Sequence, residues 1–516
     1  MSITHGGQVE ERPLLEGDDI PSSRDRILGA IGDGWRRRTA AVVVLAGIAA
    51  LIAAWLTPRS PITTVEALVS MAAALGVGVA AGVLLANRWS IVVAPATFVA
   101  VFELARMGIE GPTVDAIEFG GTYGIIALIV GRVFHGLLVL VPMMLGASYG
   151  VWWAGRTGRA SRIMGGVGRT VTGLVTVAVV AVAFFLALPA STAPIVGSDG
   201  ETLPGSIAEL VSVEIGGHPQ TMLIRGRSVD NPVLLYLAGG PGGTDLGALR
   251  RDVGLEQDFT VVAWDQRGAG KSYTALDPTE TFTLDQMVAD TLGVTNYLRD
   301  RFDVDKIYLV GQSWGSTLGV LAAQQRPELY EAFVGVGQMV SQRVTDQMFW
   351  EDTLAWAESN GNVALAETMR INGPPPYTNL IEYDPVIAYE HDWNVYSEFD
   401  PNTEMPAILF VPEYNWMDRM NAFRGFLDTV GILYPQLQDI DFRNDVASLE
   451  IPTYMVQGEH EARGRAVLAE QWFQLLDAPT KEMIVIPGGG HRAHFDQPAM
   501  FADIMRRVRD ASSTGR

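Results

Sequence analysis

The sequence predicts two structural classes in one chain: an all-α transmembrane region of about five helices, followed by an α/β domain with a doubly wound sheet. Three observations lead to this prediction. Residues 39–190 have almost no acidic side chains and are rich in Ala, Val, Leu, Gly and Ile. Residues 197–516 have the composition of an acidic soluble protein, in which short apolar runs alternate with amphipathic stretches. The length of 516 residues exceeds that of one ordinary domain.

Composition excludes several classes of function. The formal net charge of −21 argues against nucleic-acid binding, because phosphate recognition needs a basic surface. The chain has no cysteine, which excludes disulfides, thiolate catalysis and cysteine-ligated metal sites. We expect no metal and no organic cofactor.

Five apolar runs each approach or exceed the roughly 20 residues that a membrane-spanning helix needs. The fourth run is interrupted by Arg132 and His135. We interpret Arg132 as lying at a helix end, from which its side chain reaches the membrane surface; a functional intramembrane charge is the alternative. The runs are 40–57, 65–86, 90–108, 124–153 and 171–190.

The basic residues predict the orientation of these runs. They precede the first run, separate the second from the third, and separate the fourth from the fifth, whereas the loop after the third run is acidic. Basic loops remain in the cytoplasm, so the N-terminal tail, residues 1–38, is predicted there. Five spans then place the C-terminal half outside a multi-pass cell membrane, and the loss of one span would reverse this. The basic residues are Arg36, Arg37, Arg38, Arg88, Arg156, Arg159, Arg162 and Arg169.

The chain divides further by composition and pattern. Residues 39–190 form the transmembrane domain, and residues 191–206, rich in Pro, Ser, Gly and Thr, form a linker. Buried strands are predicted from continuous apolar runs, and amphipathic helices at 284–301 and 465–477. An insertion, 341–446, separates the two parts of the α/β core, 207–340 and 447–516. The strands are 232–240, 259–265, 306–313, 332–338, 452–458 and 482–489.

A candidate nucleophile lies where a predicted strand becomes a helix. Gly311, Ser313 and Gly315 form a G-x-S-x-G pattern at this turn. The glycines leave room for a tight turn that lifts the serine hydroxyl above the sheet. The N-terminus of the following helix then points at the hydroxyl, where it stabilises developing negative charge.

A nucleophilic serine needs a base and an acid, in the chain order serine, acid, histidine. His491 follows three glycines after the last predicted strand, and we prefer it to His494, which is one helical turn further on. The loop after the preceding strand offers two acids. We choose Glu461 over Glu459, which lies closer to the strand end.

The negative oxygen formed during acyl transfer needs two backbone N–H donors. One is predicted at Trp314, the residue after the nucleophile, and the other at Gly240, in the glycine-rich loop 237–247. Gly239 in the same loop is a substrate-binding candidate, since a residue without a side chain allows close approach. A phosphate cradle is the alternative use of such a loop, but the G-x-x-x-x-G-K-[ST] pattern is absent.

Together these motifs resemble the proline iminopeptidase-like branch of the α/β-hydrolases over residues 207–516, and not over the membrane half. The resemblance is carried by GGPGG, WDQRGAGKS, GQSWGS and GGGH, and it implies the same roles for Ser313, His491 and Glu461. The chain differs from the family pattern at Ala238, where members commonly have histidine, and at Glu461, where aspartate is usual. Asp265 and Arg267 are expected to support the oxyanion loop. The four motifs are residues 239–243, 264–272, 311–316 and 488–491.

Residues 341–446 occupy the place of a cap domain in this fold, which implies that they roof the serine and select the substrate. Members of the branch bind the substrate α-amino group with cap carboxylates, for which Glu351 and Glu413 are the chosen candidates; Glu390 and Glu398 are possible by the same argument. We therefore predict a membrane-anchored serine aminopeptidase acting on short peptides within reach of the lipid bilayer. The alternatives are an esterase or lipase acting on acyl esters, and a non-catalytic membrane sensor with a hydrolase fold.

Overall fold

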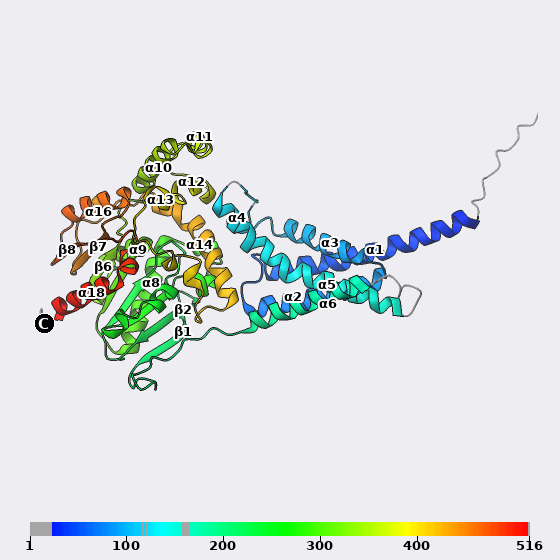
Figure 1. Cartoon of the computed structure of the whole chain (residues 1–516), viewed down its shortest axis with the longest axis horizontal. Helices are drawn as coiled ribbons and strands as arrows, with labels where there is room; N and C mark the ends of the chain where they lie inside the picture. Colours follow the sequence, from blue (N-terminus) through cyan, green and yellow to red (C-terminus); the bar gives the residue numbers. More distant parts are fainter. Residues whose placement is uncertain (1–22, 116, 120, 157–165, 514–516) are drawn as a thin grey trace, which may run out of the picture.

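The computed structural model describes residues 23–115, 117–119, 121–156 and 166–513. An elongated bundle of helices (α1 to α6) projects from an α/β domain, as Figure 1 shows. The predicted fold class is confirmed: an all-helical region precedes an α/β domain built on an eight-stranded sheet. Most of the predicted N-terminal tail, and the basic residues Arg159 and Arg162, lie outside the described residues.

Four segments among the described residues are helices long and apolar enough to cross a membrane: Gly34–Leu56, Thr64–Leu85, Thr122–Gly155 and Val167–Ala187. The third predicted run forms a shorter apolar helix, Ser90–Ala105. Its 16 residues extend about 24 Å, less than the ~30 Å of a typical hydrocarbon core. The bundle elements are α1 (Ser23–Leu56), α2 (Thr64–Leu85), α3 (Ser90–Ala105), α4 (Thr122–Leu128), the π-helix η1 (Ile129–Val133), α5 (Phe134–Arg156) and α6 (Gly166–Ala187).

The chain passes along the bundle in alternating directions. Arg59, just after α1, donates to Asp277 of the α/β domain at 3.0 Å, and Arg106, just after α3, donates to the carbonyl of Pro58 at 3.4 Å. The N–H of Thr122, where α4 begins, donates to Asp384 at 2.7 Å. The ends of α1 and α3 and the start of α4 therefore lie beside the α/β domain. Although it is short, α3 therefore runs back along the bundle and ends at the α/β domain.

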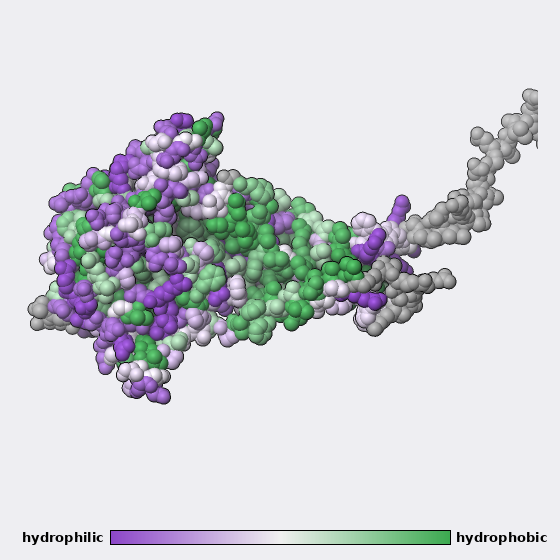
Figure 2. Space-filling view, in the orientation of Figure 1, coloured by the Kyte–Doolittle hydropathy of each residue, from purple (hydrophilic) through white to green (hydrophobic). Residues whose placement is uncertain are grey.

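The hydrophobic surface covers the middle of the bundle. Figure 2 shows it between the polar surface of the α/β domain and a second polar area at the far end of the helices. The starts of α1 and α3, with Arg36 and Arg88, belong to this far end because these helices finish at the α/β domain. Arg36 and Arg88 thus lie at the end of the bundle that is remote from the α/β domain.

The helix-end interpretation of Arg132 is wrong. The helix continues through this residue as the π-helix η1 and then as α5. Arg132 donates to the carbonyls of Val114, at 2.9 Å, and Asp115, at 2.7 Å. Its guanidinium is satisfied by the loop that follows α3, so it does not need to leave the helix for the membrane surface.

Helices α2 and α5 pack closely through small residues. A Cβ on Gly78 would lie 2.0 Å from the carbonyl oxygen of Met143, and one on Gly146 would lie 2.1 Å from that of Leu75. Glycines four residues further on, Gly82 and Gly150, complete a small-xxx-small pattern on each helix. This pattern lets membrane helices approach to backbone contact.

The sheet has the strand order β1-β2-β4-β3-β5-β6-β7-β8. All six predicted strands are present as β3 to β8 and run parallel, but the prediction missed an antiparallel hairpin, β1 and β2, which makes the sheet mixed. Gly216 and Gly217 form its turn, with φ of 57° and 79°, as a two-residue hairpin turn requires. The strands are β1 (Ile207–Ile215), β2 (His218–Gly226), β3 (Val233–Leu237), β4 (Thr260–Asp265), β5 (Ile307–Gln312), β6 (Tyr330–Val336), β7 (Thr453–Gly458) and β8 (Lys481–Ile486).

Helices complete the α/β domain and form the insertion between β6 and β7. The predicted helices at 284–301 and 465–477 correspond to α8 and α16. Those of the core are α7 (Leu246–Arg251), α8 (Leu284–Phe302), α9 (Trp314–Gln325), α15 (Phe442–Asp445), α16 (Arg463–Leu475), α17 (Ala493–Asp496) and α18 (Pro498–Ser513). Those of the insertion are α10 (Gln342–Ser359), α11 (Val363–Asn372), α12 (Asp384–Ile387), α13 (Glu390–Trp393) and α14 (Trp416–Leu437).

Helix α14 joins the cap to the helical bundle through buried polar side chains. Arg424, fully buried, donates to the carbonyls of Val130, at 3.0 Å, and Pro61, at 2.8 Å. Asp428, also fully buried, accepts from the N–H and the hydroxyl of Thr113, at 3.0 and 2.7 Å. These bonds fix the bundle against the cap independently of the chain segment that connects them.

Candidate active site

Ser313 lies at the turn between β5 and α9, as predicted. Its φ of 54° and ψ of −122° are unusual for a residue with a side chain. Its N–H donates to the carbonyl of Val336 at 2.9 Å, which ties the turn to the end of β6. A Cβ on Gly315 would lie 2.0 Å from the carbonyl oxygen of Leu237, so the second glycine of the motif is required by packing. The strained turn is the geometry expected of an exposed nucleophile.

His491 and Glu461 meet although they are 30 residues apart in the chain. The Nδ1 atom of His491 lies 2.9 Å from Oε2 of Glu461. The other carboxylate oxygen of Glu461 accepts from the N–H of Ala462, at 2.9 Å, and from Arg465, at 2.7 Å. The carboxylate is thus held in one orientation, and it leaves Nε2 of the imidazole available for a proton from a nucleophile.

Glu461 remains ionised at physiological pH. Burial alone would raise its pKa, but the charge of Arg465 and the hydrogen bond with His491 outweigh burial and lower the pKa to about 2. Arg465 is itself held by Glu390 of the cap. A permanent negative charge beside Nδ1 stabilises the imidazolium that forms when His491 accepts a proton.

The two alternative residues of the sequence analysis have other roles. His494 is buried, with Nε2 2.7 Å from the hydroxyl of Tyr236, and burial lowers its pKa well below the usual value. It is therefore neither a surface residue nor part of the pocket wall. Glu459 accepts from the N–H of Gly488 at 2.9 Å. His491 and Glu461 pair with each other, whereas His494 and Glu459 have other partners.

The glycine-rich loop lies against the nucleophile. A Cβ on Gly239 would lie 3.2 Å from Cβ of Ser313, and Gly240 has a φ of 130°, which side-chain-bearing residues rarely adopt. Trp314 is the first residue of α9, where backbone N–H groups have no partner within the helix. The loop and the helix start thus border the same space above Ser313.

The DQRG segment supports this loop through one of the two predicted residues, Asp265, and through Gln266. Asp265 accepts from the hydroxyl of Thr244, as expected for a residue that supports the loop. The expectation for Arg267 is wrong: it pairs with the buried Asp290 of α8 at 2.6 Å. Gln266 takes its place, since it donates to the carbonyl of Ala238 at 3.0 Å and accepts from the indole N–H of Trp314 at 2.9 Å.

Ser313, His491, Gly239 and Gly240 line one cavity of about 330 Å³ beneath the cap. The two carboxylates chosen from the sequence lie outside its lining. Glu351 is exposed and paired with Arg463 at 2.9 Å, and Glu413 is fully buried and paired with Arg250 at 2.8 Å. The acids that do line the cavity are Asp245, Asp346, Glu390 and Glu404.

Asp346 on α10 differs from the other three acids. Among the described residues, Asp245 and Glu404 pair with Arg492 and Glu390 pairs with Arg465, whereas Asp346 has no ion pair within 4 Å. It accepts hydrogen bonds from Gln342, Tyr434 and Gln438, at 2.8, 2.8 and 3.2 Å. Burial raises its pKa to about 7. The sequence analysis missed this residue, because its position in a helical stretch carries no motif.

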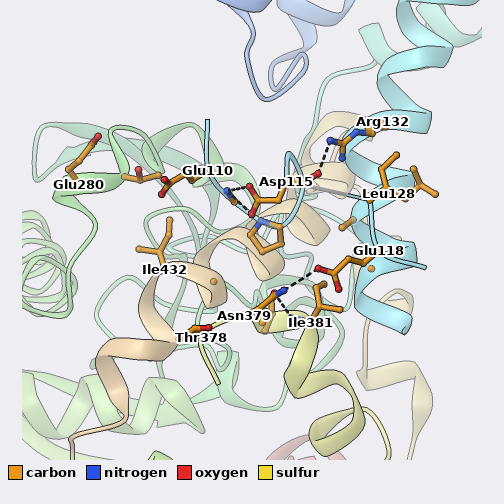
Figure 3. Close-up of a pocket in the computed structure, with 18 residues that line it drawn as sticks. Glu110, Asp115, Glu118, Leu128, Arg132, Glu280, Thr378, Asn379, Ile381 and Ile432 are labelled. Carbon is orange, nitrogen blue, oxygen red and sulfur yellow. Dashed lines mark hydrogen bonds between the residues drawn. The ribbon is translucent and has the colours of Figure 1, made fainter. Parts of the chain in front are cut away.

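A larger cavity, of about 700 Å³, lies at the junction between the bundle and the α/β domain. Figure 3 shows its acidic lining, with Glu118 bonded to Asn379 and Asp115 bonded to a backbone N–H. Its lining contains neither Ser313 nor His491. No group of three or more metal-ligating side chains occurs within the part of the chain that the structure describes.

The family of the chain follows from comparison with known proteins. Residues 232–498, more than half of the chain, match the family described as "alpha/beta hydrolase fold". The chain belongs to this family, and the resemblance found in the sequence is confirmed.

Two curated relatives carry peptidase names. The chain is 30% identical over 306 residues to "Probable aminopeptidase YbaC" of Bacillus subtilis (strain 168), covering 58% of this chain and 96% of the relative. It is 25% identical over 314 residues to "Probable proline iminopeptidase" of Leptolyngbya boryana, covering 56% and 87%. Among solved structures, the proline iminopeptidase of Mycobacterium smegmatis matches with a TM-score of 0.44 and 18% identity, covering 60% of this chain and 100% of that one.

Proposed function

We propose that this chain is a membrane-anchored serine hydrolase that releases N-terminal residues from short peptides. One observation carries the proposal: a histidine oriented by a buried carboxylate lines the same cavity as a serine on a strained strand–helix turn. The peptidase names of the relatives favour peptides over other acyl substrates.

The proposed mechanism uses five residues of the chain. Ser313 Oγ attacks the substrate carbonyl and transfers its proton to Nε2 of His491, while Glu461 accepts from Nδ1–H and keeps the imidazole in the required tautomer. The N–H groups of Gly240 and Trp314 stabilise the negative oxygen. His491 then gives the proton to the leaving amine. Water hydrolyses the resulting acyl-enzyme in a second round of the same chemistry.

Asp346 is the proposed partner of the substrate α-amino group. It lines the cavity, it comes from the cap, and the described residues offer it no ion pair that a substrate ammonium would have to displace. An ammonium beside a carboxylate favours the ionised form of that carboxylate. Substrate binding is therefore expected to lower the pKa of Asp346 below its value of about 7 in the free protein.

We further propose that the α/β domain lies outside the cytoplasm. Five alternating passes separate the start of α1 from the α/β domain, and the basic residues Arg36 and Arg88 belong to the end of the bundle that is remote from that domain. Because basic residues remain on the cytoplasmic side, this arrangement favours an outward-facing active site.

Replacement of the nucleophile tests the mechanism. Ser313→Ala in the full-length protein should reduce hydrolysis of prolyl and alanyl arylamides to the uncatalysed background and abolish labelling by a fluorophosphonate probe. Ser359→Ala, on the exposed end of α10, is the matched control and should leave both unchanged. Retention of full activity by Ser313→Ala would falsify the mechanism. If the protein hydrolyses acyl esters but not arylamides, the mechanism stands and the protein is an esterase instead of a peptidase.

A further inference from the structure

The membrane bundle contributes a residue to the candidate active-site cavity. Tyr123, in the first turn of α4, lines the cavity that contains Ser313 and His491. Every other residue of that lining comes from the α/β core or the cap. The helix that contains Tyr123 continues through η1 into α5, and together they form the candidate span Thr122–Gly155.

Tyr123 is held in place by the cap. The carboxylate of Asp384, on α12, accepts from the N–H of Thr122 at 2.7 Å and so caps the start of α4. The ring of Tyr123 packs edge-on against Phe426 of α14, with centroids 6.0 Å apart and an interplanar angle of 70°. Further along, Arg424 binds the carbonyl of Val130 in η1. Three contacts with the cap thus fix this wall of the cavity.

Tyr123 also lies next in sequence to residues of a second cavity. The residues that follow it on α4, Gly124, Ala127 and Leu128, line the larger junction cavity drawn in Figure 3. Leu380, in the 3₁₀ turn Leu380–Tyr383, borders both cavities. A smaller side chain at position 123 would therefore enlarge the catalytic cavity on the side of the membrane bundle.

Four apolar side chains, Leu380, Ile387, Phe426 and Val430, line the same cavity as Tyr123, and Phe426 contacts its ring. We propose that this wall forms an apolar subsite, and that Tyr123 limits the size of the apolar substrate group that the subsite accepts. The inference rests on the proposed function for the use of Ser313. It adds that the bundle is part of the substrate-selecting machinery, and that Tyr123 sets an upper limit on the apolar side chain that a peptide carries beside the scissile bond.

Two substitutions that change the size of the side chain at position 123 in opposite directions test this inference in the full-length protein. Tyr123→Ala should raise kcat/KM for arylamides with large apolar side chains relative to alanyl arylamide by about tenfold, mainly through KM. Tyr123→Trp should shift the same ratio in the opposite direction. Ile125→Ala, on the exposed face of α4, is the matched control and should leave the ratio unchanged. A purely structural role would lower activity on all substrates equally in both Tyr123 variants and would overturn the proposal.

A second measurement separates this inference from the peptidase assignment. Fluorophosphonates with short and long alkyl groups react with an activated serine whatever its natural substrate. Tyr123→Ala should increase the labelling rate of the long-chain probe relative to the short-chain probe by about tenfold. If arylamides are not hydrolysed but this ratio shifts, the peptidase assignment fails and the subsite stands. If labelling is normal and the ratio does not move, the subsite fails.

Discussion

Asp346 combines a raised pKa with a place in the candidate substrate cavity. A buried carboxyl with a pKa of about 7 is protonated below that pH and ionised above it. Only the ionised form attracts a substrate ammonium, so the pH range just below 7 should weaken binding of peptides with a free N-terminus.

This behaviour gives a prediction for pH dependence. In the wild-type protein, KM for an aminoacyl arylamide should rise as pH falls below about 7, approaching tenfold per pH unit. Asp346→Asn should raise KM at pH 8 by about tenfold and remove this dependence, since the neutral amide does not titrate in this range. Steady-state kinetics from pH 5.5 to 8 measure both effects.

Two controls make the result specific. Glu351→Gln changes an exposed cap carboxylate outside the cavity and should retain the wild-type profile. A substrate with an acetylated N-terminus should show no difference between Asp346→Asn and the wild type. An unchanged KM in Asp346→Asn would exclude this residue as the ammonium partner.

At this scale the sequence identified residues that belong to local motifs and missed those defined by packing. Ser313 and Glu461 occur at strand ends, where the parallel sheet predicts functional groups. Asp346 and Tyr123 reach the cavity only because the cap and α4 pack over it, and neither has a local signature. Arg465 was also missed, although it lies four residues after Glu461. Residues at this spacing are neighbours on a helix, so a pair between them could have been predicted.

Helix α14 is the element that fastens the cap to the bundle. Arg424 donates to two carbonyl oxygens of the bundle, which lie on separate segments of the chain. Removal of its guanidinium leaves these buried acceptors unpaired, and an unpaired buried polar group costs about 1–3 kcal/mol.

We therefore expect Arg424→Met to lower the stability of the folded protein by about 2–4 kcal/mol, because two acceptors lose their donor. Thermal unfolding in detergent, followed by near-UV circular dichroism, measures the loss. Arg370→Met is the matched control: its ion pair with Glu358 is exposed, and such pairs contribute about 0–1 kcal/mol. Equal losses in both variants would show that α14 does not fasten the two domains.

At the scale of elements, the sequence predicted those strands that a continuous run of apolar residues defines. Continuous apolar runs correctly located β3 to β8, because strands buried on both faces need no polar alternation. The hairpin β1–β2 was missed because β1 is partly exposed and β2, although mostly buried, mixes polar with apolar side chains, even though Gly216 and Gly217 marked its turn. The length of α3 was overestimated, since the apolar run was extended past Ala105 and Arg106, where the helix ends.

The orientation of the whole molecule in a membrane can be tested with single cysteines, because the natural chain has none. On intact cells, a membrane-impermeant maleimide should label Ser359→Cys in the cap and should not label Gly34→Cys at the start of the first candidate span. Gly34 tolerates the change, as nothing lies within 4 Å of an added Cβ. After lysis both variants should react. Labelling of Gly34→Cys alone on intact cells would place the active site in the cytoplasm.

The polar junction between bundle and cap has a consequence for how far the α/β domain can move relative to the bundle. An enzyme on a flexible tether samples a volume whose radius grows with the tether, so its encounter rate depends on linker length. Here Thr113 and Arg424 fasten the two parts through residues outside the connecting segment, so lengthening that segment would add slack without adding reach. In the proposed membrane arrangement, Ser313 lies at a fixed height above the lipid, and substrates must come to that height.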